Sequence, residues 1–233
     1  MKRKFWNWAR DADDMRILFL NGVISDETWF GDEVTPEVFR KELYSGEGEV
    51  TVWINSPGGD VFAAAQIYTM LMEYPWPVHV RIDALAGSAA SVVAMAGTDV
   101  AMSPVAMMMI HNPATITIGD AQEMQKTVDM LSEVKESILN AYELKSNLPR
   151  ARIAGLMDDE TWMNAKKAVE LGFADRVLYT EGKEDAGVES MLFSCAAVRN
   201  DFLHCLQRMK KQEKSSGCME ANVLRKRLDL LLH

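Results

Sequence analysis

The chain has few cysteines for its 233 residues, only Cys195, Cys205 and Cys218, and all three stand near the C-terminal end. An odd number of cysteines without a C-x-x-C pair argues against a disulfide framework and against a zinc site. No other metal site is indicated either. We therefore expect reduced thiols and an intracellular, cytoplasmic protein.

Long apolar runs are also lacking. No stretch of 18 uninterrupted apolar residues occurs, so no transmembrane helix and no membrane partner are expected. Residues 1–14 begin with basic side chains but contain no apolar core of the signal-peptide kind, so a secretory signal is not expected. Phe5, Trp6 and Trp8 in this segment are expected to dock onto the domain surface.

An excess of positive charge is lacking as well. The net charge of −9 disfavours general nucleic-acid binding. Residues 199–233 nevertheless hold eight basic and four acidic side chains, a net of +4, which leaves −13 for the preceding part. We predict one main domain over residues 1–183 and a basic extension over residues 184–233, partly helical or disordered. The extension could contact an acidic surface or be a solvated tail.

What the sequence does contain is an alternation of strand-like and helix-like segments. Strands are predicted at residues 16–23, 50–55, 78–83, 100–102, 105–110 and 174–179. Helices are predicted from residue 36 and at residues 61–72, 88–95, 120–144, 150–156 and 164–171. This alternation indicates an α/β domain with a largely parallel sheet.

Residues 83–95 (DALAGSAASVVAM) lead from a strand through a tight turn into a helix of small residues. Small side chains allow a sharp turn, and a serine in the first helical turn lies near the positive end of the helix dipole. Ser88 and Ser91 could equally cap and pack a buried helix. The segment is not a G-x-S-x-G turn, so that hydrolase motif does not apply.

Three other segments carry candidate groups. His111 ends a strand of bulky apolar residues and precedes a loop, where site residues are common. Gly58 and Gly59 could present backbone N–H groups to an oxyanion or to an extended peptide. The acidic residues before residue 161 could orient a histidine or complement a helix N-terminus. Each signal is weak alone, but their order is serine, histidine, carboxylate.

Four motifs occur together: I-N-S-P-G-G at 54–59, G-S-A-A-S at 87–91, M-I-H-N-P at 109–113 and A-V-E-L-G-F-A-D at 168–175. As a set they resemble the Clp protease proteolytic-subunit (ClpP-like) serine peptidase family over residues 16–179. The resemblance implies an α/β fold of the ClpP/crotonase-like type, with repeated ββα units that assemble into rings. The helix at 120–144 corresponds to the family's handle, which joins two rings.

The resemblance also implies site residues. The family nucleophile falls on Ser91, not Ser88, and the general base falls on His111. The oxyanion donors fall on the backbone N–H groups of Gly58 and Val92. The positions that line the extended substrate are Gly59, Asp60 and Ala114.

The acidic triad member departs from the family pattern. The family has an aspartate two residues before an aromatic residue, and the same count back from Trp162 gives Glu160. A glutamate reaches one carbon further, so Glu160 is favoured and Asp159 stays open.

These correspondences predict a serine endopeptidase that cuts extended polypeptides without a cofactor, as a heptameric ring or two stacked rings. The N-terminal segment that meets the ATPase in housekeeping members is not recognisable here. This difference, the basic extension and the glutamate resemble the prophage branch, so capsid or scaffold polypeptide is the expected substrate. One alternative is a housekeeping subunit with a AAA+ unfoldase partner. Another is an inactive ring-forming scaffold, and a crotonase-like acyl-CoA enzyme ranks last.

Overall fold

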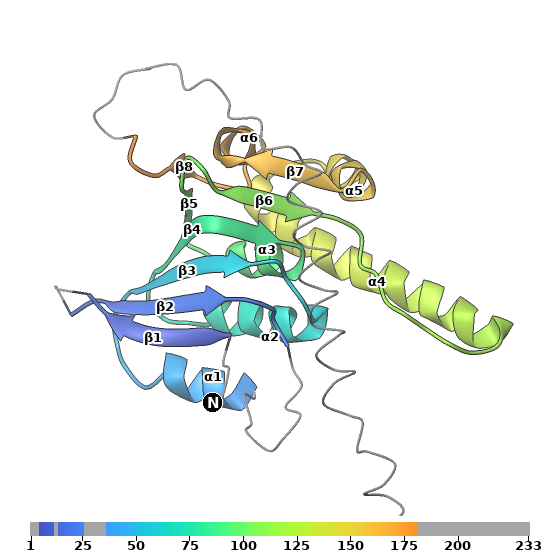
Figure 1. Ribbon diagram of the computed structural model, residues 1–233, viewed down its shortest axis with the longest axis horizontal. Coiled ribbons are helices and arrows are strands. Elements are labelled where there is room, and N and C mark those ends of the chain that lie inside the picture. The colour runs from blue at the N-terminus through green and yellow to red at the C-terminus, as the bar shows by residue number, and fades with distance from the viewer. Residues whose placement is uncertain (1–4, 12–13, 26–35, 181–233) are drawn as a thin grey trace, which may run out of the picture. The chain divides into compact units, whose positions relative to one another are not determined.

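In the computed structural model the described residues are 5–11, 14–25 and 36–180, without the side chains of residues 36 and 37. They form an eight-stranded sheet with helices packed against it (Figure 1). The expected extension over residues 184–233, with its three cysteines, lies outside the described residues and stays a prediction.

The strands, in chain order, are β1 (Trp6–Arg10), β2 (Arg16–Asn21), β3 (Val50–Ser56), β4 (Val78–Gly87), β5 (Asp99–Met102), β6 (Met107–Ile110), β7 (Thr161–Asn164) and β8 (Arg176–Val177). The helices are α1 (Pro36–Leu43), α2 (Val61–Met72), α3 (Ala89–Ala94), α4 (Ala121–Ser146), α5 (Arg150–Asp158) and α6 (Ala165–Glu170). Among the described helices, none is both long and apolar enough to cross a membrane.

The sheet runs in the order β1-β2-β3-β4-β5-β8, and β6 pairs with both β4 and β7. All pairs are parallel except β1 with β2 and β6 with β7. The predicted α/β class with a largely parallel sheet is therefore confirmed.

β4 is long enough to pair with two different strands on one side. Its first half, His79–Ile82, pairs with β5, and its last residues, Leu85–Gly87, pair with β6. The sheet therefore forks along β4. The end of β4 runs with β6 and β7 into a second arm, and this arm carries the candidate site.

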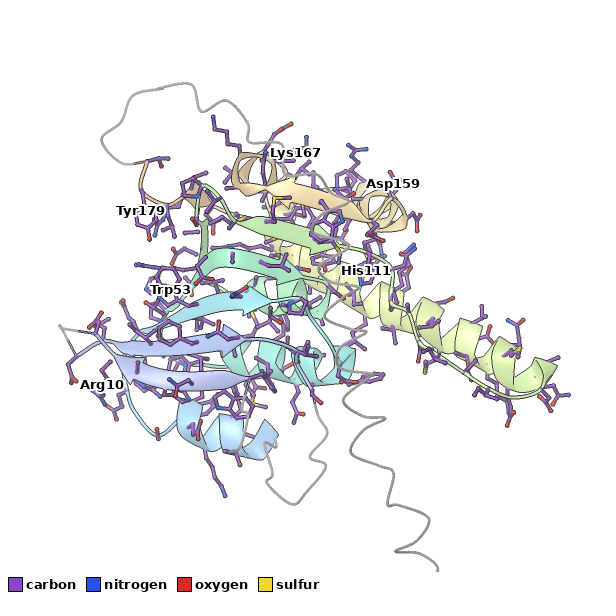
Figure 2. All side chains as sticks on the ribbon, in the orientation of Figure 1. Arg10, Trp53, His111, Asp159, Lys167 and Tyr179 are labelled. Carbon is purple, nitrogen blue, oxygen red and sulfur yellow. The ribbon has the colours of Figure 1, made fainter. Side chains whose placement is uncertain are left out.

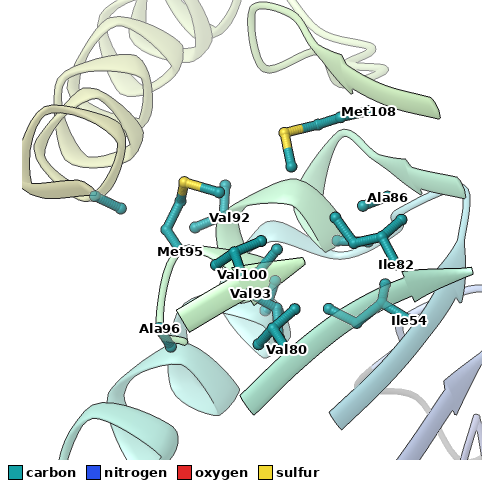
Figure 3. Close-up of a cluster of buried hydrophobic side chains, with 14 of the residues drawn as sticks. Ile54, Val80, Ile82, Ala86, Val92, Val93, Met95, Ala96, Val100 and Met108 are labelled. Carbon is teal, nitrogen blue, oxygen red and sulfur yellow. The ribbon is translucent and has the colours of Figure 1, made fainter. Parts of the chain in front are cut away.

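Alternation along the strands builds the core. In β4, Val78, Val80 and Ile82 are buried, whereas the residues between them are partly exposed on the other face. The side chains of Val80 and Ile82 lie in one buried cluster with Val92 and Val93 of α3 (Figure 3). Complete burial of each such aliphatic side chain contributes about 1.5–3 kcal/mol. This packing fixes α3 against the sheet.

Helix caps define where the two longest helices begin. Asp60 caps α2 by accepting a hydrogen bond from the backbone N–H of Ala63 at 2.7 Å. Asp120 and Glu123 form a reciprocal capping box at the start of α4. α4 then extends well past the sheet (Figure 1), and several apolar side chains on its first half are exposed.

Two strands were not predicted from the sequence. β1 was expected only as an aromatic segment docked on the surface, but it is an antiparallel edge strand whose Trp6 is buried. β7 was read as the residues preceding a helix, but it pairs with β6 from Thr161 opposite Ile110 to Asn164 opposite Met107. This pairing positions the acidic residues just before β7 at the end of β6.

Candidate active site

Ser88 stands at the turn between the end of β4 and the start of α3. Its backbone has φ 52° and ψ −125°, a strained combination for a residue with a side chain. The Ser88 N–H donates to the carbonyl of Met109 in β6 at 2.9 Å. The turn therefore places the half-buried Ser88 hydroxyl next to the second arm of the sheet, which β6 and β7 form.

His111 directly follows β6 and meets this hydroxyl. The distance from Ser88 Oγ to His111 Nε2 is 2.7 Å, which is a short hydrogen bond. Partial burial lowers the pKa of His111 below its ordinary value, and the negative charge of Glu160 opposes that shift. The neutral imidazole is thus favoured at neutral pH, and only the neutral ring can accept a proton.

The structure does not bring Ser91, the predicted nucleophile, to His111. The Ser91 side chain is fully buried, one helical turn into α3. Its Oγ donates to the Ser88 carbonyl at 2.6 Å and lies 2.7 Å from the hydroxyl of Tyr142. Ser91 therefore faces the interior beneath α3, and the serine that contacts His111 is Ser88.

Sequence reasoning had a signal for Ser88 that was not used. The hydroxyl that remains accessible is the one at the junction of strand and helix, as in the strand-turn-helix nucleophile of α/β hydrolases. A serine one turn further into a helix of alanines and valines is buried by the same small residues. The family resemblance alone favoured Ser91, which lies three residues further along the chain.

Gly58 lies against this turn from the β3 side. An added Cβ at Gly58 would lie 2.7 Å from the Gly87 carbonyl oxygen, 2.8 Å from the Ser88 Cβ and 2.9 Å from the Ala89 nitrogen. Its φ of +99° also disfavours any residue with a side chain. Only glycine fits, and its backbone reaches the turn at Ser88 directly. The Gly58 N–H donates to Ser56 Oγ at 3.1 Å.

Val92, the second expected oxyanion donor, directly follows Ser91 inside α3 and does not directly follow Ser88. Val92 is buried in the fourth position of α3, three residues beyond Ala89. The residue after Ser88 is Ala89, the first of α3, and the first N–H groups of a helix have no acceptor within it. Ala89 N–H, next to Gly58, is therefore the available donor.

The three expected substrate-lining residues lie on two separate segments. Gly59 forms a parallel bridge with Ile24, and Asp60 caps α2. Ala114 is exposed in the irregular segment between His111 and the start of α4. Neither segment contains Ser88: one joins β3 to α2, and the other joins β6 to α4.

Asp159 and Glu160 form the turn between α5 and β7, and both are exposed (Figure 2 labels His111 and Asp159). Glu160 has φ 47° and its charge raises the pKa of His111. Its carboxylate accepts a long hydrogen bond, 3.4 Å, from Trp162 Nε1. Within the described chain no hydrogen bond joins either carboxylate to His111, so Glu160 acts on the imidazole through its charge.

A second polar cluster adjoins His111 and was not expected. Asn112 Nδ2 donates to Asp158 Oδ1 at 2.8 Å, and Lys135 of α4 donates to the same oxygen at 2.5 Å. The bond from Lys135, followed by that from Asn112, lowers the pKa of Asp158. The cluster ties the segment after β6 to both α4 and α5.

A serine hydroxyl bonded to a partly buried histidine, beside the first N–H of a helix and near a carboxylate, is the arrangement of groups found in serine hydrolases. A protein-family model described as Clp protease matches residues 3–181. The chain therefore belongs to the Clp protease family, and it is a serine-type endopeptidase.

Curated relatives agree with this family. The ATP-dependent Clp protease proteolytic subunit 2 of Thermobifida fusca is 31% identical over 165 residues, which cover 70% of this chain and 80% of that protein. The ATP-dependent Clp protease proteolytic subunits of Porphyromonas gingivalis and Bacteroides fragilis are 27% and 28% identical over the same share of this chain, covering 73% and 79% of those proteins. Members of the family form oligomeric rings and act with unfoldases.

Proposed function

We propose that this chain hydrolyses peptide bonds of extended polypeptides with Ser88 as the nucleophile and His111 as the general base. The observation that carries the proposal is the 2.7 Å hydrogen bond between Ser88 Oγ and His111 Nε2. In the reaction, His111 takes the hydroxyl proton as Ser88 attacks the scissile carbonyl, and later gives it to the leaving amine.

The environment of His111 suits a base at neutral pH. Burial lowers its pKa, so most of the imidazole is neutral and ready to accept a proton. Once the proton arrives, the imidazolium is stabilised by the Glu160 carboxylate, whose charge raises the pKa. Glu160 is therefore our acidic triad member, with Asp159 as the alternative.

The N–H groups of Gly58 and Ala89 are the proposed oxyanion donors. They come together because Gly58 has no side chain to keep its backbone from Ser88 and Ala89. In this structure Gly58 N–H donates to Ser56 Oγ. During the reaction it must therefore share its proton between Ser56 Oγ and the oxyanion, or exchange one acceptor for the other. Gly59, Asp60 and Ala114 remain the proposed contacts for the extended substrate.

Assembly into a heptameric ring, single or stacked in pairs, is the proposed oligomeric state. Apolar side chains are exposed along the first half of α4 and on the segment before it: Ile116, Ile118, Met124, Val128 and Met130. Such a cluster on one projecting element is characteristic of a protein contact. The family's oligomeric rings support the same conclusion.

A prophage role in capsid or scaffold maturation remains our proposal for the biological setting, with the cytoplasm as its compartment. Its support among the described residues is the glutamate at position 160 in place of an aspartate. The second candidate, a subunit that works with a AAA+ unfoldase, is favoured by the relatives, whose names describe ATP-dependent proteases. Capture of a host unfoldase by the purified chain would select the second candidate. Cleavage of the co-expressed capsid protein without ATP would select the first.

The catalytic assignment is tested by labelling the full-length protein with a fluorophosphonate and locating the adduct by mass spectrometry. We expect the adduct on Ser88. Ser88→Ala should lose the label and about 10⁴-fold or more of peptide hydrolysis. Ser45→Ala, which removes an exposed serine hydroxyl far along the chain, is the matched control and should keep both. An adduct on Ser91 would refute the assignment. A wild-type protein that takes no label would instead support the alternative of an inactive, ring-forming scaffold.

A further inference from the structure

A buried hydrogen-bonded chain joins α4 to the nucleophilic turn. Tyr142 of α4 is completely buried and packs edge-on against Phe173, with ring centroids 5.5 Å apart. Its hydroxyl lies 2.7 Å from Ser91 Oγ, and Ser91 Oγ lies 2.6 Å from the Ser88 carbonyl oxygen. Nothing in the catalytic proposal uses Tyr142 or Ser91.

The direction of these hydrogen bonds follows from the groups involved. A carbonyl oxygen only accepts, so Ser91 donates its one hydroxyl proton to Ser88, and Tyr142 must then donate to Ser91. Burial raises the pKa of Tyr142 well above that of an ordinary tyrosine, so this donor stays protonated. The Ser88 carbonyl also accepts from the backbone N–H of Ser91 at 2.9 Å. Two donors therefore hold one carbonyl oxygen.

The Ser88 carbonyl and the Ala89 N–H belong to the same planar peptide unit. Holding the oxygen inward beneath α3 therefore directs the N–H away from Ser91. It also polarises the peptide, because hydrogen bonds in series strengthen one another. The strained φ and ψ of Ser88 mean that this peptide is not in a conformation it would adopt alone. A rotation of the peptide would relieve the strain and turn Ala89 N–H out of the site.

We propose that Tyr142 and Ser91 are positioning residues that hold the Ser88–Ala89 peptide so that Ala89 N–H is aimed at the oxyanion. The inference rests on the proposed function, because it assumes that Ser88 is the nucleophile and that Ala89 is a donor. Under this proposal α4 acts on the active site through the hydroxyl of Tyr142, a residue 51 positions from Ser91 in the sequence.

The first test is Tyr142→Phe, which removes one hydroxyl and keeps the ring. Removal of a whole oxyanion donor lowers kcat by about 10²–10³-fold, so loss of its alignment alone should lower kcat by roughly tenfold. KM for a short peptide substrate should stay within about twofold, because the oxyanion forms only in the transition state. The inhibition constant of a peptide boronate, which forms a tetrahedral adduct, should rise by the same factor as kcat/KM falls. An unchanged kcat would overturn the proposal.

The second test separates positioning from stability. Ser91→Ala leaves the buried Tyr142 hydroxyl without its acceptor, which destabilises the fold. The double variant Ser91→Ala/Tyr142→Phe removes both partners, so its melting temperature should recover relative to Ser91→Ala. Its kcat should stay low, because no side chain then holds the Ser88 carbonyl. Recovery of kcat together with the melting temperature would mean that the pair is only structural. If Ser91→Ala does not fold, Tyr142→Phe and the double variant still decide.

Two controls complete the design. Tyr74→Phe removes another buried tyrosine hydroxyl, one that donates to the Gly48 carbonyl at 2.8 Å. It should lower the melting temperature and leave kcat unchanged, and a fall in kcat equal to that of Tyr142→Phe would overturn the proposal. Ser88→Ala tests the proposed function itself: if it kept full activity, the catalytic assignment would fail, whatever Tyr142→Phe does.

Discussion

Replacement of Gly58 by alanine should damage both the stability and the activity of this protease. The new Cβ would lie 2.7–2.9 Å from three atoms, the Gly87 oxygen, the Ser88 Cβ and the Ala89 nitrogen. None of these is the end of a flexible side chain, so the backbone must move. The overlap should cost about 1–3 kcal/mol, as overpacking does elsewhere. The φ of +99° should add a further strain of about 1–3 kcal/mol.

Gly48 offers a control that carries the same backbone penalty. Its φ is +95°, and an added Cβ there would meet no atom within 4 Å. The difference between Gly58→Ala and Gly48→Ala therefore isolates the overlap at the active site. We expect a difference of about 1–3 kcal/mol in the free energy of unfolding, measured by urea denaturation with fluorescence detection.

Activity should separate the two variants more strongly. A displacement of a catalytic group by about 1 Å can lower the rate by about 10²-fold, and Gly58→Ala moves the turn that carries Ser88. Peptide hydrolysis should therefore fall by about 10²-fold or more in Gly58→Ala and remain near wild type in Gly48→Ala. Equal stability and equal kcat for the two variants would refute the claim that the Gly58 backbone fits directly against the turn at Ser88.

Three further outcomes are expected. Because the Glu160 charge raises the pKa of His111, Glu160→Gln should lower that pKa and move the acid limb of the kcat/KM pH profile to lower pH; an unmoved limb would transfer the role to Asp159. Lys135→Met should raise the pKa of Asp158 toward its ordinary value, observed by NMR titration of the carboxyl carbon, since its hydrogen bond is the first cause of the lowering. The 26.1 kDa chain should scatter light as a large assembly while active, and an active monomer or dimer would rule out a ring requirement.

Much of the fold could be predicted because local signals were sufficient. α2 spans residues 61–72 as predicted, since an aspartate caps its start and prolines follow its end. β1 and β7 could not be found in this way. β7 has only four residues, too few for a periodic pattern, and its pairing with β6 joins residues about fifty positions apart. Such a strand is defined by its partner.

The site was predicted in outline but not in detail. His111 and the carboxylate pair lie where the order of the motifs suggested, near one another at the end of β6. The sequence could not show that Ser88, and not Ser91, contacts His111, because the distinction between the two serines lies in one pair of backbone angles and in the partner of each hydroxyl. Neither property is visible in a run of alanines and serines. The choice of Val92 as a donor followed from the choice of Ser91.

The fork of the sheet along β4 also defines an angle that can be measured in any structure of this protease, the angle between the two arms of the sheet. Gly58 belongs to the arm built on β3, whereas His111 follows β6 in the other arm. Ser88 directly follows β4, which is the strand that both arms share. Two structures superposed on β2, β3 and the first half of β4 can therefore be compared by the angle of the β6–β7 hairpin. His111 directly follows β6, so a change in that angle would change the distance between His111 and Ser88.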